Sequence, residues 1–117
     1  MKLAAILLFA GIVFAHEPVK GKPITLNGLV VDTGCYFSHD SKGDKHAECA
    51  TTCAKAGVPL AILDEKTGAV YLPIAADHKN QNDRLLPFIE KQVKVTGVLY
   101  ERGGVKGLVL KTVAAAQ

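Results

Sequence analysis

VKVTGVLYERGGVKGLVLKTV, residues 93–113, decides the fold of this chain. Two valine-rich segments favour β-strands, and the glycine pair between them favours a tight turn. Val93 and Val95 alternate with polar residues, and the alternation resumes with a slip of one residue at Gly97. A period of two places one face of a strand against a core. We therefore predict a long hairpin with one buried face, formed by strands at 93–101 and 105–113.

Three further strands are predicted upstream of this hairpin. β-Branched residues favour strands at 24–32 and 58–64, and a polar turn at 65–68 leads into a returning strand at 69–73. Gly28 lies inside the first of these strands, where an isolated glycine is typical of a β-bulge. The second and third strands should pair antiparallel, because only a short turn separates them.

Two helices are also predicted. Residues 45–56 contain several alanines and no glycine or proline, Asp44 is a suitable N-cap, and Gly57 stands where a C-cap belongs. A second, short helix is expected at 84–90, with Pro87 in its first turn, where a missing N–H is tolerated.

Five strands with a helix between the third and fourth follow the order of an OB-fold barrel. The chain resembles small OB-like domains of exported bacterial proteins through GLVVD at 28–32 and VKVTG at 93–97. Cys35-Tyr36, HAECA at 46–50 and Cys53 are similar to an insert found in such domains. The resemblance covers residues 24–113 and implies a mainly β barrel with a helix inserted between its first two strands. It implies no established activity.

The first fifteen residues predict export. Lys2 precedes an apolar segment at 3–14, and Ala15 ends a small-residue cleavage site, as in a secretory signal peptide. The apolar segment is shorter than the roughly 20 residues that span a bilayer. We expect a periplasmic or secreted protein without a membrane span after cleavage. Its predicted organisation is a signal peptide at 1–15, an extended lead-in at 16–23, an OB-like domain at 24–113 and a tail at 114–117.

Charge and motifs exclude several functions. The chain has 14 basic and 11 acidic side chains, a net charge of +3 that is too small and too scattered to indicate nucleic acid. No nucleophile elbow, zinc-protease motif or phosphate-binding loop occurs, so we nominate no catalytic residue and favour a role other than catalysis. A protein or small-ligand partner at the barrel face stays open, and no residue indicates which. The sequence is equally silent on oligomeric state.

Four residues with metal-ligating side chains stand within nineteen positions: Cys35, His46, Cys49 and Cys53. If 44–56 is helical, the last three share one face at i, i+3 and i+7. Cys35 arrives from the end of the first strand and completes a set that suits zinc or copper. His39 in the adjacent polar loop, and His16 if cleavage makes it N-terminal, are possible additional ligands. We therefore predict a metal-binding or metal-handling protein.

The odd number of cysteines leaves two alternatives open. Cys49 and Cys53 are poor partners, because residues four apart on a helix have Cβ atoms about 5–6 Å apart, beyond the reach of a disulfide. Cys35 can instead bridge Cys49 or Cys53, which would make the chain a disulfide-stabilised OB-like interaction module. A thiol redox role is the other alternative, although the usual Cys-x-x-Cys motif is absent.

Overall fold

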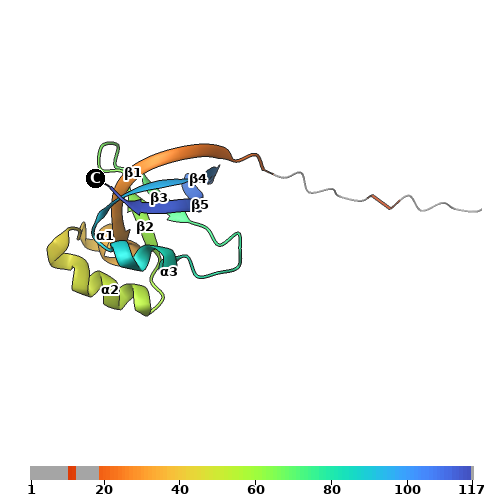
Figure 1. Ribbon diagram of the computed structural model, residues 1–117. Helices are drawn as coiled ribbons and strands as arrows, with labels where there is room; N and C mark the ends of the chain where they lie inside the picture. Colours follow the sequence, from red (N-terminus) through yellow and green to blue (C-terminus); the bar gives the residue numbers. More distant parts are fainter. Residues whose placement is uncertain (1–10, 13–18, 117) are drawn as a thin grey trace, which may run out of the picture.

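The computed structural model describes residues 11–12 and 19–116 of the chain (Figure 1). Most of the predicted signal peptide, residues 1–15, lies outside these described residues. Within the described part of the chain, no helix is both long enough and apolar enough to cross a membrane.

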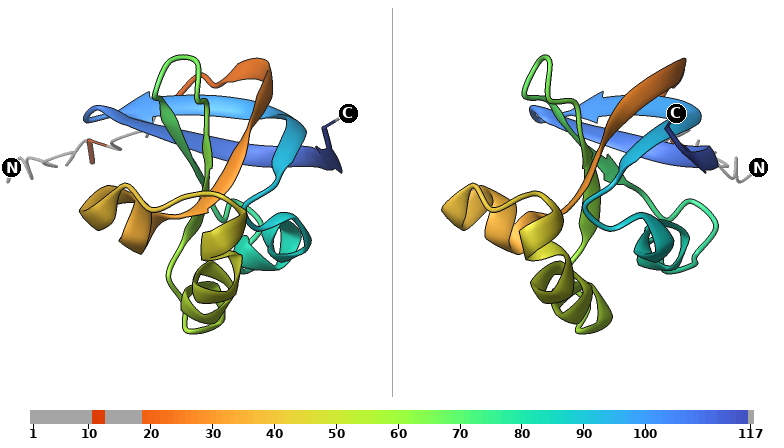
Figure 2. Two further views of the ribbon diagram at one scale, coloured as in Figure 1. Left: turned by 90° about the vertical axis from the view of Figure 1, so that its left-hand side faces the viewer. Right: turned by 60° about the vertical axis from the view of Figure 1, so that its left-hand side comes forward.

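Five strands close into a barrel (Figure 2). Their order around it is β1-β2-β3-β5-β4, in which β3 and β5 run parallel and the other neighbours antiparallel. The predicted OB-like barrel with helical insertions is thus confirmed. The strands are β1 (Lys22–Asp32), β2 (Leu60–Leu63), β3 (Val70–Pro73), β4 (Gln92–Arg102) and β5 (Val105–Ala115).

The β4–β5 hairpin has the predicted slip at Gly97, where the register shifts between Thr96 and Gly97. A side chain at Gly97 would collide with the backbone carbonyl of Val109, so the bulge requires glycine. The bulge predicted at Gly28 is wrong, because β1 pairs with β4 through this position without a shift. Gly28 instead allows the backbone of β1 to approach Leu63 of β2 closely.

Several predicted boundaries differ from the structure. β1 begins at Lys22 rather than at residue 24, because Lys22 and Pro23 pair with β4. The helix expected at 84–90 starts earlier and divides into α3 (Asn82–Leu85) and the 3₁₀ helix η2 (Leu86–Phe88). Pro87 explains this division, because it lacks the N–H that would continue the α-helical hydrogen bonds.

The core fills the barrel and continues beneath the helix that carries two of the cysteines. Val30, Ile62, Val93 and Leu108 are fully buried inside the barrel. Two alanines of α2 (Ala47–Lys55), at positions 50 and 54, pack against the same cluster. Small side chains on this face let α2 lie close to the strands. The helices α1 (Thr33–His39), α2 and α3 gather at one end of the barrel (Figures 1 and 2).

Asn82, the first residue of α3, fastens α2 to β2. Its side-chain amide accepts a hydrogen bond from the N–H of Leu60 at 2.8 Å and donates to the carbonyls of Val58 at 2.9 Å and Ala54 at 3.1 Å. The residue is 6 % exposed. Because a buried amide with all three bonds made is costly to remove, Asn82 holds the end of α2 at a fixed place on the barrel.

Candidate metal centre

Cys35 is held in place by the residue that ends β1. Asp32 is fully buried, and its Oδ1 accepts a hydrogen bond from the backbone N–H of Cys35 at 2.9 Å. This contact makes Asp32 the N-cap of α1 (Thr33–His39), a helix that we did not predict. The sequence signal for it was present, because an aspartate three residues before Cys35 has the spacing of a capping contact. Cys35 therefore projects from a short helix rather than from the end of a strand.

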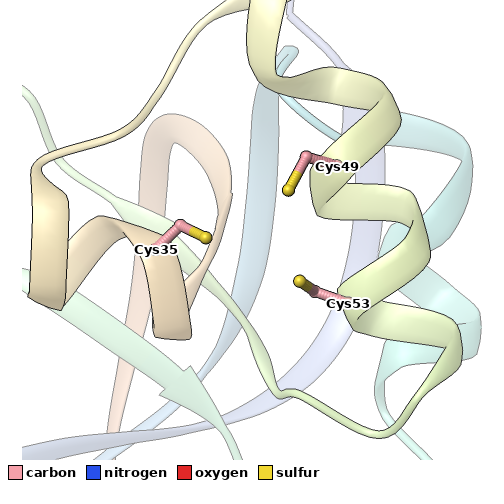
Figure 3. Close-up of side chains that lie close together, drawn as sticks. All are labelled: Cys35, Cys49 and Cys53. Atoms are coloured by element: carbon pink, nitrogen blue, oxygen red, sulfur yellow. The ribbon is translucent and has the colours of Figure 1, made fainter.

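Cys49 and Cys53 lie one turn apart on α2, and their sulfur atoms face that of Cys35 across the gap between the two helices (Figure 3). The three sulfur atoms all lie within 4.8 Å of one another. Cys35 and Cys53 are half-buried, whereas Cys49 is exposed to solvent. No disulfide joins any pair of them, so the structure holds three thiols.

His46 lies in a 3₁₀ turn that precedes α2. The helix predicted at 44–56 consists of this turn, η1 (Asp44–His46), followed by α2. His46 Nε2 lies 2.8 Å from Oδ2 of Asp32. Sequence reasoning missed Asp32 because it appeared to be no more than the last residue of a strand.

The four predicted ligands and Asp32 form two groups that share Cys35. One group consists of Cys35, Cys49 and Cys53, and the other of Asp32, Cys35 and His46. The ligand atoms within each group lie within 4.8 Å of one another. His39 is exposed near the end of α1 and belongs to neither group, and His16 lies outside the described residues.

Negative charge and burial together hold protons on two of the thiols. Burial raises the pKa of Cys35 to about 11, and the neighbouring charges of Asp32, Cys49 and Cys53 act in the same direction. Burial and the charge of Asp32 also raise the pKa of Cys53. A cation reverses this effect, because it stabilises the thiolates that the neighbouring negative charges disfavour. The centre is therefore electrostatically suited to a cation.

Glu90 connects this centre to the start of β4. Its Oε2 accepts a hydrogen bond from the N–H of Gly43, which immediately precedes η1, at 2.7 Å. Its other oxygen, Oε1, is buried without a hydrogen-bond partner among the described residues. Burial raises the pKa of the Glu90 carboxyl, while the Gly43 hydrogen bond and the charge of His46 oppose the rise. Glu90 thus positions the turn that carries His46, at an electrostatic cost.

Replacing Glu90 with glutamine should change how stability depends on pH. A carboxyl whose pKa is raised by folding stabilises the protein below its unfolded pKa, about 4.3, and this contribution is lost as pH rises through the folded pKa. Thermal melts by circular dichroism from pH 4 to 8 should show wild type losing stability relative to Glu90→Gln across that window. Glutamine retains an acceptor for Gly43, so the comparison isolates the charge. Parallel pH profiles would contradict this account.

No protein family, curated protein or solved structure matches this chain at a significant level.

Proposed function

We propose that this chain is an exported metal-binding protein that holds zinc or copper on Cys35, Cys49 and Cys53. The observation that carries the proposal is the convergence of three sulfur atoms within 4.8 Å from two separate helices. Sulfur atoms around a tetrahedral zinc, with Zn–S bonds of about 2.3 Å, lie about 3.8 Å apart. Small side-chain movements are therefore enough to close the three thiolates around one ion.

The ligand type favours a thiophilic metal. Thiolates select Cu(I) and Zn²⁺ over hard cations such as Mg²⁺ and Ca²⁺. Three thiolates complete a trigonal set for Cu(I), whereas Zn²⁺ prefers a fourth ligand, which water can supply at the exposed side beside Cys49. Because Cys49 is exposed, an incoming ligand can reach the bound ion from solvent. This accessibility supports a metal-handling role rather than a purely structural one.

The same electrostatics argue against the redox alternative. Reactive thiols in oxidoreductases have lowered pKa values, because the thiolate is the attacking species. Here the pKa values of Cys35 and Cys53 are raised. Both thiols are consequently poor nucleophiles without a cation beside them, and this supports binding over thiol exchange.

Metal content and thiol counts test the proposal. The full-length chain is produced with its own leader in a bacterial host, purified without chelators, and examined by elemental mass spectrometry and by thiol titration with and without reductant. We expect at least one equivalent of zinc or copper, three thiols once the metal is removed by a chelator, and less metal per chain in Cys49→Ser than in wild type. His39→Ala is the matched control, because His39 belongs to neither ligand group, and it should retain the metal.

Two outcomes would overturn the proposal. Metal at background level, with one free thiol before reduction and three after it, would identify a disulfide between Cys35 and a cysteine of α2. Full metal retention in Cys49→Ser would place the bound metal elsewhere on the chain.

A further inference from the structure

Asp32 and His46 form a second, more buried set of ligands beside the three cysteines. We propose that Asp32, Cys35 and His46 hold a second metal ion, a divalent cation of the Zn²⁺ type, and that the Cys35 thiolate bridges it to the first. This inference rests on the proposed function and extends it from one metal position to two.

The geometry of the second group suits zinc. Two ligand atoms at about 2.0–2.1 Å from a tetrahedral zinc lie about 3.3 Å apart. Nε2 of His46 and Oδ2 of Asp32 are already 2.8 Å apart, and both lie within 4.8 Å of the Cys35 sulfur. The ion takes the place of the hydrogen between these two atoms, and the bound imidazole, which is neutral, then carries its one proton on Nδ1. Oδ1 of Asp32 keeps its hydrogen bond to the Cys35 N–H, which holds the carboxylate in position.

The two groups have one residue in common. No single group unites Asp32 and His46 with Cys49 and Cys53 among the described residues, whereas Cys35 belongs to both. In the geometry of the structure, the carboxylate and the imidazole therefore group with Cys35 and not with Cys49 and Cys53. The second group also mixes sulfur, nitrogen and oxygen, a set that zinc accepts and that Cu(I) does not favour.

Two divalent ions balance the charge of the fully deprotonated ligand set. The four ionisable ligands, Asp32 and the three cysteines, each carry one negative charge when deprotonated. One divalent ion leaves half of this charge uncompensated, and Asp32 is 0 % exposed. Uncompensated charge in a buried position is costly, so deprotonation of all four ligands requires a second divalent ion.

Zinc stoichiometry tests this inference. The reduced full-length protein is loaded anaerobically with zinc sulfate, freed of excess ion and assayed for zinc per chain. We expect two equivalents in wild type and one in His46→Ala. Cys53→Ser should also bind one equivalent, because it retains the Asp32 group. Asp32→Asn, which keeps a capping acceptor for α1, should bind one equivalent as well.

A Co²⁺ titration tests the bridge. The electron paramagnetic resonance signal of the first Co²⁺ should weaken when the second ion binds to wild type, because a shared thiolate couples the two spins. The signal should not weaken in His46→Ala.

A folded His46→Ala variant with the same single equivalent of zinc as wild type would overturn the second position and leave the proposed function intact. Loss of all zinc in this folded variant would identify one shared site, and this result would also overturn the second position. Absence of zinc from wild type would overturn the second position, and it would overturn the proposed function as well if the purified protein also holds no copper.

Discussion

Cys35→Ser is expected to lower zinc affinity at both metal positions, by about a hundredfold or more at each. Structural zinc sites bind with roughly 10–16 kcal/mol, so each of four ligands contributes about 3 kcal/mol on average. Cys35 belongs to both ligand groups, and serine is a much poorer zinc ligand than a thiolate. Competition with a chromophoric zinc chelator measures the affinities directly.

Cys49→Ser is the matched control for this substitution. It makes the same chemical change, but Cys49 belongs only to the three-cysteine group. Replacing Cys49 should lower the zinc affinity of one metal position and leave the Asp32, Cys35 and His46 group intact. Equal losses of zinc affinity in the two variants would show that Cys35 is not a ligand at both metal positions. A smaller loss in Cys35→Ser than in Cys49→Ser would contradict the bridging geometry.

Asn82→Ala should lower the free energy of unfolding by about 3 kcal/mol, the largest stability effect that we predict. The substitution leaves the N–H of Leu60 and the carbonyl of Val58 without their partner, whereas the carbonyl of Ala54 keeps its hydrogen bond from the N–H of Gly57. An unpaired buried polar group costs about 1–3 kcal/mol, and here two such groups are created. Urea unfolding followed by circular dichroism measures the change.

Asn27→Ala controls for the loss of an asparagine. Asn27 is exposed on β1, and its side chain makes no hydrogen bond within the described residues, so its replacement should change stability by less than about 0.5 kcal/mol. Zinc should also restore part of the stability lost in Asn82→Ala, because a ligand that binds only the folded state adds stability by mass action. Equal stability of the two variants would show that the Asn82 hydrogen bonds contribute little.

Local patterns were sufficient to predict the barrel. Alternating β-branched residues define strands through a period of two, and glycine-rich turns define the hairpins, so both signals depend only on neighbours in the chain. The slip at Gly97 was visible for the same reason. Gly28 was misinterpreted as a bulge. Glycine is needed there because the backbone of β2 approaches closely, and β2 is distant in the sequence.

The sequence by itself determined which side chains are available for the metal centre, namely three cysteines and a histidine in a short insert. Only the tertiary structure decided how these side chains are divided into two ligand groups. Asp32 becomes a capping residue once the chain turns from β1 into α1, and the 3₁₀ turn before α2 brings His46 to that carboxylate. The contact between Asp32 and His46 depends on how a buried strand end meets a turn that is distant in the sequence. Such contacts leave no periodic signal, because the burial that enforces them exists only after the barrel has closed.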